Sequence, residues 1–414
     1  MTDRDALYRA VLDNPDDDTV RLVYADALEE SGDPRRAALV RAGVEQSRLP
    51  EYDPVAVRAR RQNQKRQADG ARWIIELPPL PDGVSWARDP FRRGLPAAIQ
   101  AQNGAAFVAR ADELFALYPI ESLELAVTRV ADTAALAACP WLSRVRHLAL
   151  VQGAGAQGLQ RLLGSEHFER LTDLHLGSQL TTAAAVSVVV RSPVFGRLTA
   201  LSVREDRPGG GSLVGALARL PHPPQLTNLD LSGNRLNAES LRPLLESAAL
   251  EAVVELSLSD NNLGAAGTAA LAAAPLPNLR ALHLARTRPT VEGVAALVGA
   301  NFFRGLRGLS LAGNSLAPAA AARLAGAPAS GLCVLNLDGN NLGDPGAVAL
   351  ATGANLAGLL VLEAAEAGIG GPGADALAQS AALAGLMHLG LCGNALPAPA
   401  AARLRKRFGD RLFL

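Results

Sequence analysis

The chain has 414 residues, in which 40 basic side chains balance 40 acidic ones, and 49% of its residues are hydrophobic but only 4% are aromatic. A neutral chain has no general electrostatic attraction to nucleic acid or to an anionic membrane, so we expect neither as a partner. No apolar stretch approaches the ~20 residues that span a bilayer, and the first residues lack the basic start and apolar core of a secretory signal.

The cysteines Cys139, Cys333 and Cys392 lie far apart in the chain and fit no zinc-ligand spacing. They cannot all pair in disulfides, which agrees with a reducing compartment. We therefore expect a cytoplasmic protein without a metal or another cofactor.

Residues 1–48 are expected to form a small all-α domain of three short helices. Thr2 and Asp5 resemble a capping pair for the first helix, and Asp33 before Pro34 has the pattern of an N-cap followed by proline at the first helical position. Apolar side chains at helical spacing would form a shared core: Leu7, Val11, Leu22, Tyr24, Ala25, Leu28, Leu39 and Val40. Because so short a chain buries only a marginal core, we expect this domain to lean on another part of the protein.

Several short motifs in this segment resemble the repeat-companion domain found at the front of many planctomycete proteins that carry repeats. The matching residues are Asp16, Asp17, Arg21, Leu22, Val23, Tyr24, Ala25, Asp26, Leu28, Glu29, Glu30, Gly32, Asp33, Arg36, Ala37, Val40 and Arg41. Two departures are visible: Ala27 stands where the family usually has tryptophan, and Ala38 and Leu39 stand where it has a Glu-Phe pair. The resemblance implies an architecture and a lineage more than an activity.

Residues 49–90 are expected to form a helix followed by a proline-rich connector. The helix carries a basic run made of Arg58, Arg60, Arg61, Lys65 and Arg66. The favoured interpretation is a solvated helix face that pairs with the acids at 16–18. The alternative is a binding site for an anionic partner.

Residues 91–414 are expected to form a leucine-rich-repeat solenoid with a cap at each end. The pattern L-x-x-L-x-L-x-x-N-x-L recurs every 26 to 28 residues, with copies starting at Val145, Leu171, Leu198, Leu226, Val253, Leu279, Leu306, Leu332, Leu359 and Leu386. So regular a period is characteristic of repeat architectures, and a weaker copy starts at Ile120. The first cap would comprise 94–99 and a helix over 105–117, with Trp86 and Phe91 as packing aromatics. The last cap would be a helix over 399–407 and a closing strand over 408–414.

Each repeat is interpreted as a strand, a turn and a helix. In the alternation L-x-L the leucines point inward and the intervening residues point outward. A polar side chain after the strand can satisfy backbone groups of the turn; it is Asn234, Asn261, Asn314, Asn340 or Asn394, with Gln179, Asp206 and Thr287 as weaker substitutes. Gly153 and Ala367 interrupt this series and predict irregular turns.

The spacing of these elements predicts an α/β array that is curved. Parallel strands lie ~4.8 Å apart, whereas neighbouring helices need roughly 8 to 10 Å. The strands must therefore line a concave face and the helices a convex face. Repeats of this kind resemble the ribonuclease-inhibitor-like class of leucine-rich repeats, and the resemblance covers residues 120–396.

The candidate chemical sites all have a simpler structural interpretation. The outward histidines His147, His175, His283 and His388 are spread over repeats too distant for shared coordination at ~2 Å. One outward column holds the residue types of a hydrolytic triad, but serine and not histidine is its middle member, the wrong order for a relay: His175, Ser202, Asp230, Ser257, His283, Ser310, Asn336, Glu363. Residues 209–212 lack the strand and the lysine of a phosphate loop. We expect no catalytic, cofactor-binding or metal site and no enzyme activity.

The concave face remains as the candidate surface. Its predicted binding residues are Asp173, His175, Asp230, Glu255, Ser257, Asp260, His283, Asn336, Asp338 and Glu363. With Glu205 and Glu366 its acids outnumber Arg204 and Arg286, a mild acidic bias that favours a basic protein partner. The face lacks Trp and Tyr, which usually anchor tight interfaces.

The sequence thus predicts a non-catalytic protein–protein interaction module that acts as a monomer. One alternative is a regulator of an enzyme, because leucine-rich arrays of this class include a family of GTPase activators; Arg204, Arg286 and Arg288 are the arginines available for such a role. The other alternative is a structural repeat protein without a specific ligand.

Overall fold

The fold is taken from a computed structural model that describes residues 3–50, 52–53, 55–56, 67–177, 180, 182–204, 210–221, 225–328 and 330–414. The chain divides into two compact units, Met1–Leu201 and Ser202–Leu414. Several residues singled out from the sequence lie outside the described ones: Thr2, the basic run Arg58, Arg60, Arg61, Lys65 and Arg66, and Gln179, Glu205, Asp206 and Gly209.

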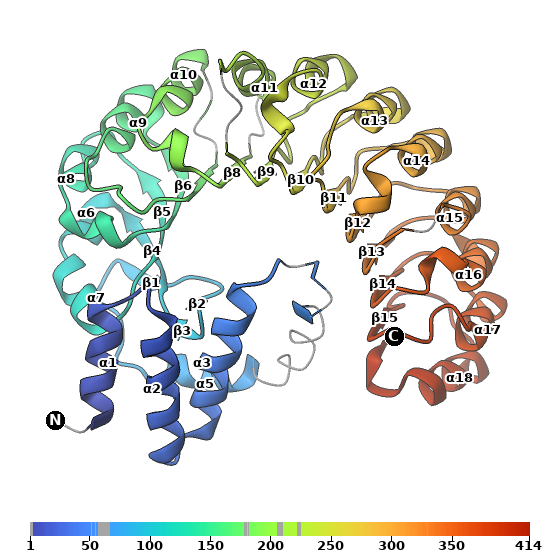
Figure 1. The fold of residues 1–414 in the computed structure, drawn as a ribbon, viewed down its shortest axis with the longest axis horizontal. Coiled ribbons are helices and arrows are strands. Elements are labelled where there is room, and N and C mark those ends of the chain that lie inside the picture. Colours follow the sequence, from blue (N-terminus) through green and yellow to red (C-terminus); the bar gives the residue numbers. More distant parts are fainter. Residues whose placement is uncertain are drawn as a thin grey trace. The chain divides into compact units, whose positions relative to one another are not determined.

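The first unit begins with the predicted helices α1 (Asp3–Asp13), α2 (Asp18–Glu30) and α3 (Pro34–Ser47) (Figure 1). The cap expected at Asp33 is present, and Asp17 caps α2 in the same way. The Asp17 carboxylate accepts a hydrogen bond from the Thr19 amide at 2.7 Å, and the Asp33 carboxylate accepts one from the Arg36 amide at 3.1 Å. The prediction of an all-α segment is confirmed.

The unit continues into a sheet whose strands alternate with helices. β1 is antiparallel to β4, and β4, β5, β6 and β7 are parallel neighbours in chain order. The strands are β1 (Val84–Trp86), β2 (Phe91–Arg92), β3 (Leu95–Pro96), β4 (Ala98–Asn103), β5 (Ser122–Thr128), β6 (His147–Gly153) and β7 (Asp173–Leu176), and β8 (Ala200–Val203) crosses the boundary between the units. The helices are α5 (Gln67–Glu76), α6 (Gly104–Val108), α7 (Ala111–Leu117), α8 (Thr133–Ala137), η2 (Pro140–Arg144), α9 (Gly155–Leu163), α10 (Ala183–Arg191) and η3 (Phe195–Arg197).

One prediction for the first cap is wrong. The helix expected over 105–117 is divided into α6 and α7, because the Arg110 amide bonds to the Phe107 carbonyl at 3.0 Å in a tight turn that ends α6. The expected packing aromatics are in place: the Trp86 and Tyr118 rings lie 4.9 Å apart, and those of Phe91 and Trp73 lie 5.8 Å apart.

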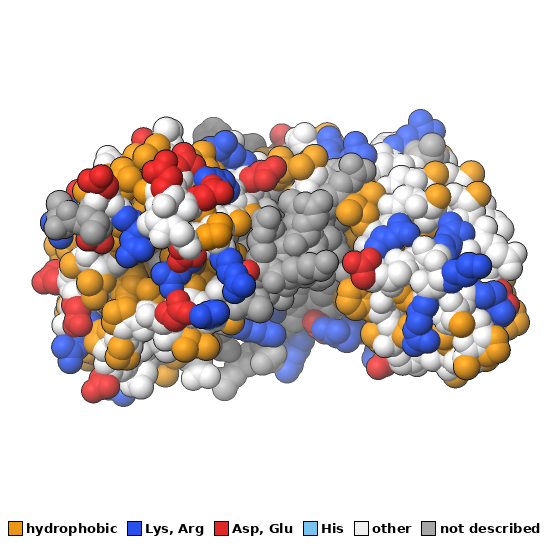
Figure 2. Space-filling model, turned by 90° about the horizontal axis from the view of Figure 1, so that it is seen from below, with side chains coloured by type: hydrophobic (Ala, Val, Ile, Leu, Met, Phe, Trp, Pro, Cys, Tyr) orange, Lys and Arg blue, Asp and Glu red, His pale blue; other side chains and the backbone are white. Residues whose placement is uncertain are grey.

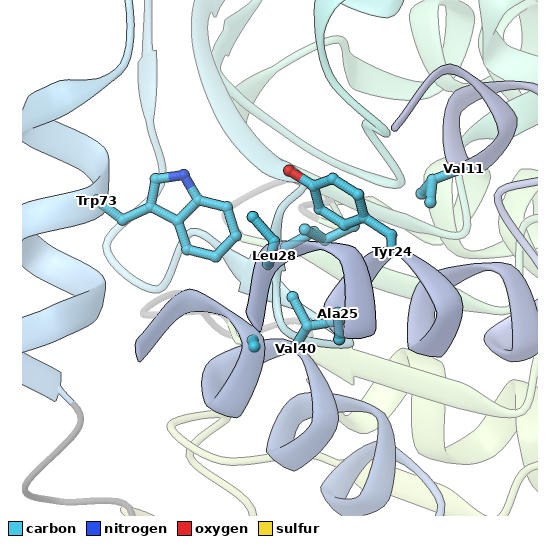
Figure 3. Close-up of a cluster of buried hydrophobic side chains, with 8 residues drawn as sticks. Val11, Tyr24, Ala25, Leu28, Val40 and Trp73 are labelled. Atoms are coloured by element: carbon cyan, nitrogen blue, oxygen red, sulfur yellow. The ribbon is translucent and has the colours of Figure 1, made fainter. Parts of the chain in front are cut away.

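The core of the N-terminal helices is completed by residues farther along the chain (Figure 3). Val11, Tyr24 and Leu28 belong to one buried cluster with Trp73 of α5 and Leu95 of β3. A core of three short helices alone would be marginal. The added indole and leucine explain how so small a segment is stabilised.

Ion pairs and a hydrogen bond connect the N-terminal helical segment to the first repeats of the unit. Asp16 pairs with Arg170 at 2.6 Å and also with Arg146, and Arg144 donates to the Leu12 carbonyl at 2.6 Å. These cations come from the segments that precede successive strands. The N-terminal helices therefore pack on the array and do not form a separate body.

Helix α3 also contacts the β2–β3 hairpin backbone to backbone. A Cβ atom on Gly43 would lie 2.0 Å from the Gly94 nitrogen, and one on Gly94 would lie 2.4 Å from the Val40 Cα. No real side chain tolerates such a distance, so glycine is required at both positions.

We expect Gly43→Ala to destabilise the protein by at least about 1–3 kcal/mol through overpacking, although alanine ordinarily stabilises a helix interior by roughly 0.5–1 kcal/mol relative to glycine. The measurement is urea unfolding followed by circular dichroism. Gly196→Ala is the matched control, because a Cβ atom there meets nothing within 4 Å. Equal unfolding midpoints for the two variants would refute the close contact between α3 and the hairpin.

The second unit repeats strand, turn and helix. Its strands are parallel neighbours in chain order: β9 (Asn228–Asp230), β10 (Glu255–Ser257), β11 (Ala281–His283), β12 (Gly308–Ser310), β13 (Val334–Asn336), β14 (Val361–Glu363), β15 (His388–Gly390) and β16 (Leu412–Phe413). Its helices are α11 (Gly210–Ala218), α12 (Ala238–Leu245), η4 (Ala248–Leu250), α13 (Gly264–Ala273), α14 (Thr290–Gly299), η5 (Phe303–Gly305), α15 (Pro318–Ala325), α16 (Gly343–Thr352), η6 (Ala354–Leu356), α17 (Gly371–Gln379), α18 (Ala398–Phe408) and η7 (Gly409–Arg411).

Within this unit the strands lie on the inner side of an arc and the helices on its outer side (Figure 1). The central leucines of successive strands are register partners and are buried, for example Leu229, Leu256 and Leu282. The residues on either side of them point outward. The fold class is therefore the predicted α/β leucine-rich-repeat solenoid, with strands on the concave face and helices on the convex face.

Asparagine side chains, buried at Asn261, Asn314 and Asn340 and half-buried at Asn394, bind the turns after the strands. The Asn261 side chain accepts the Asn234 and Leu236 amides at 3.0 and 2.8 Å, and it donates to the Leu231 and Leu258 carbonyls, both at 2.9 Å. Asn314, Asn340 and Asn394 make the same four kinds of bond. Each side-chain amide thus satisfies backbone groups of the turn, as the sequence predicted, and it also binds the repeat before it.

The two interruptions of this series differ. The turn at Gly153 is irregular as predicted, with positive φ values at Gly153 and Ala154. The turn at Ala367 is regular, so that prediction is wrong: its amide donates to Asn394 at 3.0 Å and its carbonyl accepts the Gly343 amide at 3.0 Å. The reason is that the neighbouring repeat supplies the asparagine.

The C-terminal cap is a helix, a 3₁₀ turn and a short strand. α18 has Pro399 in its first turn as expected, but η7 replaces the first part of the predicted closing strand, because Gly409 turns the chain with φ 56°. Two basic side chains bind the cap to the repeat before it: Arg403 pairs with Asp375 at 2.6 Å, and Arg411 donates to the Leu386 carbonyl at 2.8 Å. The basic last turn of α18 belongs to the group of Lys and Arg at the right of Figure 2.

We expect Asn340→Ala to lower the free energy of unfolding by about 2–4 kcal/mol, because it leaves buried amides and carbonyls without partners. Asn341→Ala is the control: its side chain is exposed and makes no hydrogen bond among the described residues, so we expect a change within about 0.5 kcal/mol. Chemical denaturation of both variants measures the difference. A loss for Asn340→Ala no greater than that of the control would contradict the role of the buried amide.

Candidate interaction surface

The concave face of the second unit, defined as the outward strand residues and the turn residues that follow them, is the main candidate. It contains Asp230, Glu255, Ser257, Asp260, His283, Asn336, Asp338 and Glu363. All of these side chains are half-buried except Asp260, which is exposed. The remaining predicted binding residues, Asp173 and His175, lie on β7 of the first unit and are also half-buried.

Asp230 is the centre of a hydrogen-bonded cluster. Ser202 donates to it at 3.2 Å, Arg204 donates from Nη2 at 3.2 Å, and the Ser232 amide donates at 2.9 Å. The Ser232 hydroxyl also donates to Asp230, so Ser257 is the donor in the 2.7 Å bond between the two hydroxyls. Burial raises the pKa of Asp230, but the hydrogen bonds from Ser232 and the charge of Arg204 outweigh it and hold the pKa below its ordinary range.

Glu255 is held between two neighbouring strands. Asn228 of β9 donates to it at 3.1 Å, and a ring nitrogen of His283 of β11 lies 3.1 Å from its other carboxylate oxygen. The side chains come from consecutive repeats, so the sheet itself sets their spacing. The predicted residues Glu255 and His283 therefore form one cross-strand pair.

His388 corrects an expectation. The sequence placed it among surface histidines, but its side chain is only 7% exposed: it pairs with Glu363 and stacks on the Phe413 ring at 4.5 Å. The closing strand β16 supplies the aromatic cover. Gly390 makes room for the pair, because a Cβ atom there would lie 1.7 Å from the Glu363 carboxylate.

The turn residues carry a further pair. Arg286 binds the Asp260 carboxylate through two nitrogens, one of them at 2.7 Å. Asp338 accepts the Ala365 amide at 2.7 Å, and its own amide donates to Asn336 at 2.9 Å. Both carboxylates are therefore bonded within the surface, although Asp260 remains exposed to solvent.

The first unit shows the same kind of cross-strand contact. His147 of β6 lies 3.3 Å from the Asp173 carboxylate of β7, and Thr172 donates to that carboxylate at 2.6 Å. Burial raises the pKa of Asp173, but the bonds from His147 and Thr172 hold it below its ordinary range. Glu124 of β5 accepts a bond from Gln100 of β4 at 2.9 Å.

In the outward column of the second unit, Ser257 bonds to the Ser232 hydroxyl and a ring nitrogen of His283 lies beside Glu255. These two neighbours therefore do not form the serine–imidazole pair of a hydrolytic relay. The described part of the chain also holds no group of three or more His, Cys, Asp or Glu side chains placed to bind a metal ion. None of its helices is long and apolar enough to cross a membrane.

The turns after the strands use left-handed backbone conformations. The residue before the asparagine position is glycine with positive φ at 233, 313, 339 and 393, but Asp260, Arg286 and Glu366 occupy it with φ 59°, 54° and 51°. The left-handed conformation costs a non-glycine residue roughly 1–2 kcal/mol, whereas an exposed ion pair contributes about 0–1 kcal/mol. The ion pair between Asp260 and Arg286 therefore contributes less free energy than the left-handed backbone of these two residues costs.

Three turn residues with left-handed backbone were not among the surface residues predicted from the outward strand positions. Arg235, Arg288 and Ser315 follow the asparagine position with φ 54°, 59° and 52°. Arg235 and Arg288 are exposed, and neither makes an ion pair or a side-chain hydrogen bond among the described residues. The sequence did contain a signal for this turn: a Gly-Asn dipeptide recurs after the strands of several repeats, and glycine and asparagine favour left-handed backbone.

Charge is unevenly distributed along the concave face. Around β9–β11 the acids Asp230, Glu255 and Asp260 stand beside Arg204, Arg235, Arg286 and Arg288. Around β13 and β14 stand Asp338, Glu363 and Glu366, with no arginine at the corresponding positions. The acidic bias inferred from the sequence is thus confined to the later repeats.

We expect Asp230→Asn to destabilise the protein mainly at neutral pH. A carboxyl group whose pKa is lower in the folded state stabilises the fold above its unfolded pKa of ~3.9, and this contribution is lost as the pH falls through the folded-state value. The difference in urea midpoint between wild type and variant should be largest above about pH 5 and shrink below about pH 4.

The control for this measurement is Glu246→Gln, which replaces an exposed carboxylate without an ion pair or side-chain hydrogen bond among the described residues. Its midpoint should stay close to that of the wild type throughout. If the difference in urea midpoint between wild type and Asp230→Asn stays constant from pH 7 to pH 3, the ionised Asp230 carboxylate does not stabilise the fold.

A match to one family model supports the assignment of two of the repeats. The family model described as Leucine Rich repeat matches residues 253–272 and 332–351. No curated protein matches the chain. An internalin (inlF) from Listeria monocytogenes aligns with a TM-score of 0.41 and 17% identity over 69% of this chain and 78% of that chain. A chain of the Rad7 and Elc1 complex in yeast aligns with a TM-score of 0.43 and 14% identity over 74% of this chain and 76% of that chain.

Proposed function

We propose that this chain is a non-catalytic protein-binding module that uses the concave face of its second unit. The observation that carries the proposal is the state of the outward side chains. They are polar, half-buried and already held by cross-strand bonds such as Glu255 to His283 and Asp230 to Ser202. A surface ordered before binding loses little side-chain entropy when a partner docks.

The partner we propose is a protein that presents a basic segment to the later repeats. Asp338, Glu363 and Glu366 give this part of the concave face a negative charge without a neighbouring arginine. The face offers no Trp or Tyr as an anchor. We therefore expect many small polar contacts and a moderate affinity.

The N-terminal helices have a separate role in this proposal. We assign residues 1–48 to a cap of the first repeats, residues 49–90 to its connector and residues 91–414 to the solenoid. The contacts of Asp16 with Arg146 and Arg170 support such a cap. The resemblance of 1–48 to the planctomycete repeat-companion domain, and of the repeats to the ribonuclease-inhibitor-like class, is part of the same proposal.

We further propose that the protein acts as a cytoplasmic monomer. The cysteines Cys139, Cys333 and Cys392 are free thiols, which suits a reducing compartment. The last strand, β16, is only two residues long, and a short edge strand discourages pairing with another copy.

A role as a regulator of an enzyme, such as a GTPase activator, has weaker support. Such a role needs an arginine that can be presented to the reacting phosphate. Arg204 and Arg286 are held by Asp230 and Asp260, and among the three arginines considered only Arg288 has no partner within the described residues. A structural repeat protein without a ligand is the remaining alternative.

The test is a steric block on the concave face. We expect Ser310→Trp, a half-buried outward position on β12, to abolish recovery of a partner that the wild type captures from native lysate with cross-links to the strand face. Ala322→Trp, on the exposed side of α15, is the control and should retain the partner. Circular dichroism first establishes that both variants fold. If both capture the same proteins as the wild type, the concave face of this unit is not the binding surface.

A further inference from the structure

The most strained turn of the second unit follows β11. Arg286, Arg288 and Thr290 have φ values of 54°, 59° and 55°, so three residues other than glycine adopt the left-handed conformation within five positions. Other repeats place glycine at matching points, such as Gly313 and Gly339. Strain of this kind persists where the surrounding structure imposes it, and it tends to collect at functional sites.

The surrounding structure holds this turn from both sides. The Asn314 side chain accepts the Thr287 and Arg288 amides at 2.7 and 2.8 Å, and Asp260 binds the Arg286 guanidinium. Thr287 is fully buried and donates to the Leu284 carbonyl at 2.8 Å. These bonds fix the backbone of the turn, so the Cα atom from which the exposed Arg288 side chain extends has a defined position.

A second arginine occupies the matching position two repeats earlier. Arg235 follows Asn234 as Arg288 follows Thr287, with φ 54°. Both guanidinium groups are exposed and lack an ion-pair partner among the described residues. Because parallel strands lie ~4.8 Å apart, the two turns are separated by about 10 Å at the sheet. Arg286, bound to Asp260, lies on the repeat of Arg288.

We propose that Arg235, Arg286 and Arg288, here called the arginine rim, dock an acidic segment of the protein partner. This inference rests on the proposed function and adds a second contact to it. A guanidinium binds a carboxylate through two parallel hydrogen bonds, which gives direction as well as attraction. Asp260 holds Arg286 until a partner carboxylate competes for it.

The surroundings favour carboxylates of a protein over a nucleic acid. Asp230 lies on the repeat of Arg235, and Glu255 and Asp260 lie on the repeat between Arg235 and Arg288, so a continuous chain of phosphates that joined the two arginines would have to cross these acids. Separate carboxylates of a peptide can bind Arg235 and Arg288 one at a time, without lying next to those acids. The acids of the later repeats, Asp338 and Glu366, would meet the basic part of the partner, so the charge pattern sets the direction in which the partner lies along the face.

The test uses glycine substitutions that separate folding from binding. Glycine removes the strain of a left-handed residue, so the double variant Arg235→Gly/Arg288→Gly should melt at or above the temperature of the wild type while losing the binding groups. Ser315→Gly changes the same turn position one repeat after Arg288 and is the matched control. It should gain stability in the same way and keep wild-type binding.

The probe is a fluorescein-labelled peptide of alternating glutamate and glycine, added to the full chain and followed by anisotropy at low salt. We expect the double variant to bind at least tenfold more weakly than the wild type and Ser315→Gly. The same peptide with glutamine should not bind, and twelve-nucleotide single-stranded DNA should bind more weakly than the glutamate peptide. Raising the salt concentration should weaken binding, because exposed charges are screened.

Each opposite result overturns the inference. It fails if the wild type does not bind the glutamate peptide, if the double variant binds it as the wild type does, or if the oligonucleotide binds more tightly. These results are distinct from failure of the proposed function, which the Ser310→Trp capture measures. Loss of capture in Ser310→Trp with unchanged peptide binding by the double variant would leave the concave face as the binding surface and remove the arginine rim from it.

Discussion

A parallel strand of three residues leaves part of the backbone of the turn after it outside the strand ladder. Some amides of these turns, such as that of Asp260, bond to the backbone of the next repeat. Others bond to asparagine side chains: Asn261, Asn314, Asn340 and Asn394 each bind groups of two successive repeats. An unsatisfied buried amide or carbonyl costs as much as a lost hydrogen bond. The register of the strands and the outward columns depend on this link between repeats, whereas the curvature follows from helices that need more space than strands.

The concave face follows from that link. Once the strands are in register, side chains from consecutive repeats stand opposite one another and bond across the sheet, as Glu255 does with Asn228 and His283. The acids are therefore largely compensated within the surface. What remains is a difference along the unit, with arginines on the turns of the earlier repeats and acids without a neighbouring arginine on the later ones. In the proposed function this pattern selects the partner more than the total charge does, which is zero for the chain.

The N-terminal helices illustrate a different constraint. A segment of three short helices cannot bury enough apolar surface alone, and here Trp73 and Leu95 complete its core while Gly43 and Gly94 let two backbones touch. Polar residues of the same segment are also engaged within the first unit, since Asp16 binds Arg146 and Arg170. These contacts show that the N-terminal helices pack on the first repeats of their own unit.

The sequence by itself determined the repeat, its period, the alternation of strand and helix and the inward leucines, because each of these follows from local periodicity. It also identified the asparagine positions and which side chains point outward. Tertiary structure alone decided which outward residues bond to each other, why His388 is buried beneath Phe413, and why the turn at Ala367 is regular. It also revealed the close approach of Gly43 and Gly94 and the strain at Arg286 and Arg288. The physical reason is that these features depend on groups one repeat or more away in the chain, and a pattern read along one segment contains no information about such neighbours.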